Sequence, residues 1–161
     1  MYRLKGGALT YHPFRVGRRY HSRNSREEGD DMAIQFNHTI LYAHDSQASA
    51  KFLAEMLGLS APARWGPFVV VKTDNGTNLD FMDTDGEITS QHYAFLVEES
   101  DFDAIFERIR ARKLAYLADP GQTQPNQINH RDGGRGLYFE DPNGHFLEII
   151  TRPYGSGGWN P

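Results

Sequence analysis

The sequence predicts an α+β fold built from two tandem βαβββ modules. One indication is a local repeat, because His38 opens a short apolar run with Ser46 eight residues later, and His92 and Ser100 repeat this arrangement. A second indication is the order of the predicted elements, which is a strand, a helix and three strands after each histidine. A third is that the runs "NLDF" and "FLEI" close the two halves.

The first module follows from local signals. An apolar run at 37–43 predicts a strand, and Ser46 is the expected N-cap of a helix that Gly58 ends. Two further strands are expected at 68–73 and 77–83. The dipeptide "NG" at 75–76 supplies the turn between these two strands. A weaker strand is expected at 63–65.

The second module repeats this pattern. A strand is expected at 91–97, and Ser100 is the expected cap of a helix with Asp103 in the capping-box position. The segments 114–119, 135–141 and 144–150 are expected to be strands, and "PNG" turns the chain between the last two. The second module is longer because of a polar loop at 119–134, and such loops are usually functional or disordered.

Composition and charge limit the function classes. The 161 residues include no cysteine, which excludes disulfides, thiolate metal sites and cysteine nucleophiles and is compatible with a reducing compartment. We therefore expect a cytoplasmic protein. No apolar run approaches the ~20 residues that span a bilayer, and the net charge of −4 gives no reason to expect nucleic acid or a membrane as partner.

The domain boundaries follow from the same patterns. Residues 1–31 lack sustained periodicity, and we predict a disordered extension there. Residues 32–161 are the predicted functional domain, with module one at about 34–83 and module two at about 91–152.

Strand alternation predicts a metal site. A helix packed on one face of each sheet would select the Leu and Ile positions, so the opposite face would carry His38, His92, Glu148 and Asp80. Two matching histidines and a carboxylate could converge on one divalent ion. Three roles remain open for Asp80: a fourth ligand, an acceptor behind the ligands, or a solvated residue. The site could lie within one chain or be shared across a symmetric dimer.

Other side chains are candidates for the chemistry. His130 lies in the long loop and could touch substrate or move a proton, as could Asp80, and Tyr138 could orient a substrate oxygen. Tyr154 is a weaker candidate, and His44 and His145 are expected to be exposed because they flank turns. Four aromatic side chains are expected to serve the substrate: Trp65, Phe68, Phe81 and Tyr93.

The sequence resembles the vicinal oxygen chelate superfamily, which includes glyoxalase I, fosfomycin- and bleomycin-resistance proteins and extradiol dioxygenases. The resemblance covers about residues 34–159 and is most specific in "YFEDPNGHFLEIITRP". It implies a cupped mixed β-sheet around a metal-binding cavity, with His38, His92 and Glu148 as ligands and Asp80 at an optional fourth position. The Asp at this position departs from the Glu of glyoxalase-I-like members. The segments "INHRDGGRGLYFEDPNGHFLEI" and "RPYGSGGW" are similar to a dioxygenase-like branch associated with aromatic polyketide tailoring.

The resemblance implies a metal-dependent enzyme that acts on a small molecule, most simply as a homodimer. A dioxygenase-like reaction on a phenolic or polycyclic aromatic substrate is the leading expectation. Fe(II) is the favoured metal, because two histidines and one carboxylate suit it, with Mn(II), Zn(II) or Ni(II) as alternatives. A glyoxalase-like isomerase or thiol transferase is the second reading, and a metal-free protein that sequesters an aromatic compound is the third.

Overall fold

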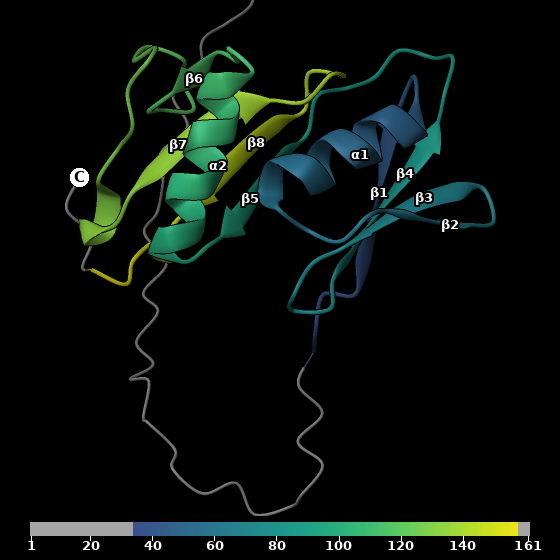
Figure 1. Ribbon diagram of the computed structural model, residues 1–161, viewed down its shortest axis with the longest axis horizontal. Coiled ribbons are helices and arrows are strands. Elements are labelled where there is room, and N and C mark those ends of the chain that lie inside the picture. Colours follow the sequence, from purple (N-terminus) through teal and green to yellow (C-terminus); the bar gives the residue numbers. More distant parts are fainter. Residues whose placement is uncertain (1–33, 158–161) are drawn as a thin grey trace, which may run out of the picture. The chain divides into compact units, whose positions relative to one another are not determined.

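The computed structural model describes residues 34–157. The extension predicted at residues 1–31 lies outside the described residues. Within the described part, the predicted α+β fold with two βαβββ modules is confirmed, and each module forms a four-stranded mixed sheet of its own (Figure 1).

Module one consists of a strand, a helix and three further strands. They are β1 (His38–Ala43), α1 (Ser46–Leu57), β2 (Ala63–Trp65), β3 (Phe68–Lys72) and β4 (Asn78–Asp83). The strand order is β1-β4-β3-β2, with β1 parallel to β4 and the other pairs antiparallel. Because β1 lies at the edge of this sheet, one side of the strand that carries His38 is left unpaired.

Module two repeats this topology. It contains β5 (His92–Leu96), α2 (Glu99–Ala111), β6 (Tyr116–Leu117), β7 (Gly136–Glu140) and β8 (Phe146–Ile150), with a short 3₁₀ turn, η1 (Arg131–Gly133), in the long loop. The strand order is β5-β8-β7-β6, and β5 runs parallel to β8. The edge strand β5 is therefore the counterpart of β1.

The predicted N-caps are wrong for both helices. Asp45, one residue before Ser46, caps α1 by accepting a hydrogen bond from the backbone N–H of Ala48 at 2.8 Å. In α2 the capping position falls on Glu98, which makes no side-chain capping bond, and Ser100 lies inside the helix. In α1 the two candidates are neighbours, and aspartate and serine are both good N-caps, so local preference does not separate them. The predicted end of α1 is confirmed, because Gly58 takes a left-handed conformation with φ +76°.

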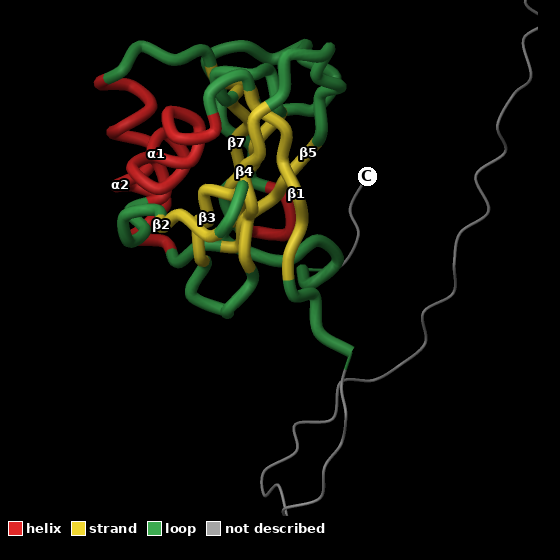
Figure 2. Tube along the Cα trace, turned by 90° about the vertical axis from the view of Figure 1, so that its right-hand side faces the viewer, coloured by secondary structure: helices red, strands yellow, loops and turns green. Residues whose placement is uncertain are grey.

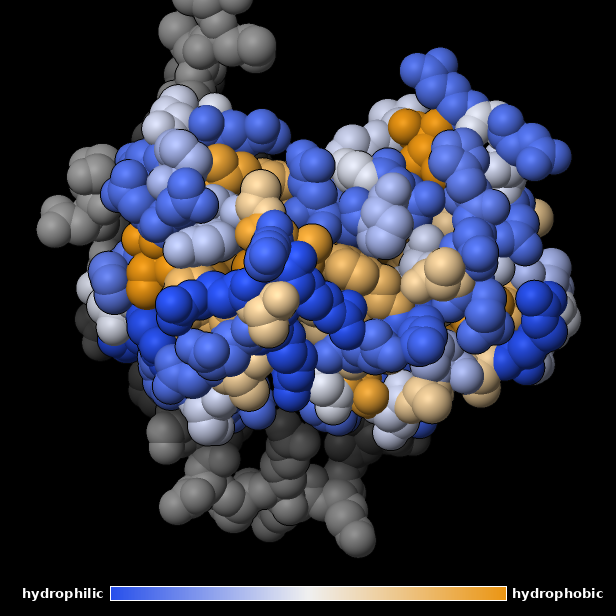
Figure 3. Space-filling view, turned by 45° about the horizontal axis from the view of Figure 1, so that its top comes forward, coloured by the Kyte–Doolittle hydropathy of each residue, from blue (hydrophilic) through white to orange (hydrophobic). Residues whose placement is uncertain are grey.

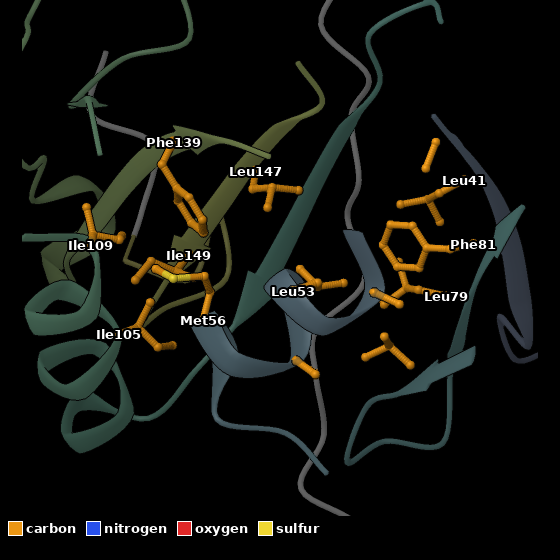
Figure 4. Close-up of a cluster of buried hydrophobic side chains, with 14 of the residues drawn as sticks. Leu41, Leu53, Met56, Leu79, Phe81, Ile105, Ile109, Phe139, Leu147 and Ile149 are labelled. Atoms are coloured by element: carbon orange, nitrogen blue, oxygen red, sulfur yellow. The ribbon is translucent and has the colours of Figure 1, made fainter. Parts of the chain in front are cut away.

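Both helices pack on the same side of the strands, as two perpendicular views show (Figures 1 and 2). The expected alternation is confirmed: Leu41, Leu147 and Ile149 are buried on the helix side. One hydrophobic core runs through both modules, and Met56 of α1 lies close to Ile105 and Ile149 of module two (Figure 4). The helices are also linked at their ends, since Arg112, which follows the last residue of α2, donates to Glu55 of α1 at 2.6 Å. The modules therefore share one core.

The turn between β7 and β8 joins the modules a second time. His145 accepts a hydrogen bond from the backbone N–H of Gln91 at its Nδ1 (3.2 Å), and its Nε2–H donates to the Tyr42 carbonyl oxygen of β1 (2.9 Å). The expectation that His145 is exposed is wrong, because only 1% of the residue is accessible. A polar ring can be buried here because both of its nitrogens are hydrogen-bonded.

Exposed hydrophobic side chains lie on the edge strands β1 and β5. On the face in Figure 3 hydrophilic side chains predominate, and hydrophobic ones show in small, separate patches. Three large apolar residues on β1 and β5 are nevertheless exposed, namely Ile40, Tyr42 and Leu96. Each shares a strand face with His38 or His92. No helix among the described residues has the length and apolar character needed to cross a membrane.

Candidate metal centre

His92 and Glu148 come together across neighbouring strands. In the parallel pair β5–β8, His92 is aligned with Phe146 and Ala94 with Glu148. The side chains of His92 and Glu148 therefore lie on the same face of the sheet, two residues apart along the strands. The carboxylate is buried, with 1% of the residue accessible. His92 Nε2 lies 3.2 Å from Glu148 Oε2. The predicted pairing of these two residues on one face is therefore present.

The tautomer of His92 shows what this pair can bind. Its Nδ1 lies 3.0 Å from the carbonyl oxygen of Phe146, which can only accept, so Nδ1 carries the hydrogen. In the neutral ring Nε2 is then a lone-pair donor that faces a carboxylate oxygen. Such a pair needs a proton or a cation between its atoms. A histidine whose Nδ1–H is held by a backbone carbonyl is also the usual form of a metal ligand. The donor set fits a divalent cation.

Two tyrosines complete this cluster. The Tyr154 hydroxyl donates to Glu148 Oε1, and the Tyr138 hydroxyl lies 3.0 Å from the Tyr154 hydroxyl. Burial is the main cause that raises the pKa of both tyrosines above the usual value, and the nearby negative charge of Glu148 raises it further. They therefore stay protonated at neutral pH. Both residues are candidates from the sequence, Tyr138 as a side chain that could orient a substrate oxygen and Tyr154 as a weaker one.

Module one carries a matching half-site. His38 donates from Nδ1 to the Asn37 side-chain oxygen at 2.8 Å, which leaves its Nε2 free to ligate. Asp80 is aligned with Ile40 of β1 and is 7% accessible, and its Oδ1 has no hydrogen-bond partner among the described residues. The alternative that Asp80 is a solvated residue is therefore wrong. A buried carboxylate oxygen without a donor is a place where a cation or a substrate donor would be stabilised.

His38 and Asp80 line a cavity of about 630 Å³. Trp65 and the cationic side chains of Arg64 and Lys72 also line it. The volume lies within the roughly 300–1,000 Å³ of small-molecule sites. Trp65 stacks with Phe68 at 6.3 Å between ring centroids, so the wall that Trp65 gives the cavity is aromatic.

The third predicted ligand does not join the other two within one chain. Among residues 34–157, no group of three or more His, Asp and Glu side chains is placed to hold a metal ion. His38 therefore stands apart from the His92–Glu148 pair. It is exposed, on the edge strand β1. Either a second copy of the chain or a movement of the modules would be needed to complete a three-residue site.

The remaining candidates lie elsewhere. His130 is exposed immediately before η1, and its side chain makes no hydrogen bond to another described residue. Phe81 is 1% accessible and packs in the core on the helix side, so the expectation that it serves the substrate is wrong. Tyr93 borders a second cavity, of about 460 Å³, where β1 and β5 approach each other. Burial raises the pKa of Tyr93.

Three known proteins show what the chain is similar to. The oxidase ChaP-H2, a protein of known structure, is 62% identical in sequence to this chain. The match covers 79% of this chain and 100% of that chain, with a TM-score of 0.77. The structure of the oxidase ChaP-H1 is 58% identical, covers 76% and 99%, and has a TM-score of 0.75. The glutathione transferase FosA of Serratia marcescens is 32% identical over an alignment of 124 positions, and this alignment covers 73% of this chain and 81% of that protein.

The family assignment agrees with the fold and with the paired half-sites. Residues 35–149, which include both modules through Glu148, match the family model described as Glyoxalase/Bleomycin resistance protein/Dioxygenase superfamily. Proteins of this superfamily are generally enzymes that use a divalent metal on small molecules. The chain belongs to the glyoxalase/bleomycin resistance protein/dioxygenase superfamily.

Proposed function

We propose that this protein is a metal-dependent oxidoreductase of the dioxygenase-like kind that acts on a small phenolic or polycyclic aromatic substrate. The observation that carries the metal is the approach of two lone-pair donors, His92 Nε2 and Glu148 Oε2, to 3.2 Å. The observation that favours oxidation is the identity of 62% and 58% with two oxidases over nearly their whole length.

The ligand set of the proposal is two histidines and one carboxylate. His92 and Glu148 come from one protomer, and His38 of the partner subunit completes the site in a homodimer. The exposed apolar residues Ile40, Tyr42 and Leu96 lie on the same strand faces as the histidines and favour burial against a second copy. We favour Fe(II), which suits two histidines and a carboxylate with open positions, over Mn(II), Zn(II) or Ni(II).

When bound, the metal would supply a Lewis acid and, as Fe(II), electrons for the reduction of dioxygen. The protein side chains position the substrate. Trp65 and its neighbours offer an aromatic surface for a ring, and the Tyr138 hydroxyl could orient a phenolic oxygen. Asp80 is the better placed of the two predicted proton carriers, because it is buried beside the His38 cavity whereas His130 is exposed.

Oxygen consumption tests this proposal directly. Apoprotein is loaded with Fe(II) or Zn(II) and mixed with a panel of catechols and polycyclic hydroquinones. Oxygen uptake that depends on both substrate and Fe(II), and that Zn(II) abolishes, is the expected result. Absence of uptake with every phenol, from protein shown to contain stoichiometric iron, would contradict it.

A thiol transferase or glyoxalase-like isomerase is the second candidate, because of the similarity to the glutathione transferase FosA. Methylglyoxal with glutathione is therefore assayed in parallel with Zn(II)- and Ni(II)-loaded protein. Turnover of the thiol adduct without oxygen uptake would favour this reading. Tight binding of an aromatic compound without turnover, unchanged by a chelator, would favour sequestration.

A further inference from the structure

The two oxygens of Glu148 have different partners. Oε1 accepts the hydrogen of the Tyr154 hydroxyl, whereas Oε2 faces His92 Nε2 at 3.2 Å. A carboxylate that binds a metal can use one oxygen or both, and it can rotate between these modes. Here one oxygen is already engaged, so the other is the one presented to a cation.

Tyr138 reinforces this arrangement from the neighbouring strand. It is aligned with Glu148 in the antiparallel pair β7–β8, and its hydroxyl lies 3.0 Å from that of Tyr154. Since Tyr154 donates its only hydroxyl hydrogen to Glu148, Tyr138 must be the donor to Tyr154. The hydrogen bonds therefore run in one direction, from Tyr138 through Tyr154 to Oε1.

Tyr154 is brought to the carboxylate by the segment after β8. The Asp132 side chain accepts hydrogen bonds from the backbone N–H groups of Gly155 (3.1 Å) and Gly157 (3.2 Å). Gly155 has φ +81°, and a Cβ at Gly157 would collide with the backbone of Asp132. Only a glycine-rich segment can make this close approach. We call residues 152–157 the C-terminal arm.

The anchor of the arm belongs to the long loop. Asp132 lies in η1 and itself has a left-handed conformation, with φ +54°. Such a conformation is uncommon for residues other than glycine, although asparagine and aspartate adopt it more readily than most. The loop at 119–134 thus ends in a turn whose carboxylate receives the C-terminal arm.

We propose that Tyr154 is a positioning residue for the metal ligand Glu148, and that the docking of the C-terminal arm on Asp132 holds it in place. The inference rests on the proposed metal site. With its hydrogen bond to Oε1, Tyr154 keeps Glu148 as a one-oxygen ligand through Oε2. Without that bond the carboxylate is free to rotate or to bind through both oxygens.

The test is the substitution Tyr154→Phe, measured by titration of the apoprotein with Co(II) and by the visible absorption spectrum of the Co(II) form. Loss of a hydrogen bond behind a ligand typically costs 10- to 100-fold in metal affinity, so a loss of about tenfold is expected. The Co(II) spectrum should also change shape, because it reports the geometry of the ligands. A purely structural role of Tyr154 would leave the spectrum of the saturated protein unchanged.

Tyr116→Phe is the matched control. Tyr116 belongs to β6, and its hydroxyl makes no hydrogen bond to another described residue. This substitution should leave affinity and spectrum as in the wild type. Asp132→Ala tests the anchor and should weaken Co(II) binding in the same direction as Tyr154→Phe but less, because the Tyr154 hydroxyl is retained.

The outcomes separate the two levels of the proposal. Wild-type protein that fails to bind Co(II) would overturn the metal site itself. Wild-type protein that binds Co(II), with the same affinity and spectrum in Tyr154→Phe, would overturn the positioning role and leave the metal site standing. Asp132→Ala protein indistinguishable from the wild type would overturn the part assigned to the arm.

Discussion

At the scale of single residues, His145 does more for the fold than its position beside a turn indicates. Both ring nitrogens are hydrogen-bonded to backbone groups, one in each module. His145→Ala would leave the Gln91 N–H and the Tyr42 carbonyl without these partners and would open a cavity. We expect a loss of about 2–3 kcal/mol in the free energy of unfolding, measured by urea denaturation.

His130→Ala is the control for this prediction. The ring of His130 is exposed, so its removal should change the free energy of unfolding by no more than about 0.5 kcal/mol. Equal effects of the two substitutions would show that His145 does not join the modules.

Glu148 offers a second prediction at this scale. Glu148→Gln conserves the shape of a buried side chain but removes the negative charge that stabilises a bound cation. We expect the affinity for a divalent metal to fall by at least about tenfold, measured by competition with a chromophoric chelator. The exposed residue Glu140 supplies the control, and Glu140→Gln should bind metal as the wild type does. Unchanged affinity in Glu148→Gln would remove Glu148 from the ligand set.

Strand alternation predicted some of these residues and missed others for a physical reason. His92 and Glu148 lie within regular strands, so the two-residue period places them on one face without any knowledge of the tertiary structure. Tyr154 and Asp132 lie outside the repeat, in a tail and a turn. They meet only because two non-repetitive segments dock, and no local period reports such a contact.

At the scale of elements, α2 is attached to its sheet through Arg135, just before β7. The guanidinium donates to Glu99 Oε2 at 2.7 Å and to Asp103 Oδ1 at 2.6 Å, and it lies 4.3 Å from the centre of the Phe102 ring. Asp103, which the sequence predicts in a capping box, forms an ion pair with Arg135 instead. The two acids are largely exposed, so solvent screening reduces the strength of each pair.

Arg135→Ala should therefore lower the free energy of unfolding by about 1–2 kcal/mol, because it removes two ion pairs, a bond to the Glu99 carbonyl and the stacking on Phe102 together. Chemical denaturation at low and high salt is the measurement, and the difference from the wild type should shrink with salt. Arg110→Ala, which removes one exposed i,i+3 pair with Glu107, should cost less than about 0.5 kcal/mol. A salt-independent loss in Arg135→Ala would show that packing dominates.

At the scale of the whole molecule, the placement of the two modules decides whether the half-sites meet. The sequence predicted each module well, because strand period, turn residues and helix ends are local. It left open whether His38 reaches His92 and Glu148, because that depends on how two similar units pack. In the structure the modules share one core and the bonds of His145, and His38 stays apart from the other ligands.

A shared site makes a prediction that a site within one chain does not. His38→Ala and His92→Ala protomers should each form dimers with little metal. In a mixed dimer, the His38→Ala protomer keeps His92 and Glu148, and its partner supplies an intact His38. One of the two metal sites of the mixed dimer is then complete, and the second site lacks both histidines. Mixed dimers, purified through two different affinity tags, should hold about one metal ion against about two in the wild type.

A second mixture serves as the control for this experiment. His92→Ala and Glu148→Gln alter the same half-site, so a dimer of these two protomers has one lesion in each site whichever way the protomers combine. It should recover no metal and no oxygen uptake, whereas the first mixture recovers both. If neither mixture recovers metal, the three ligands belong to one chain, and the modules of that chain must then close around the ion to bring His38 to the His92–Glu148 pair.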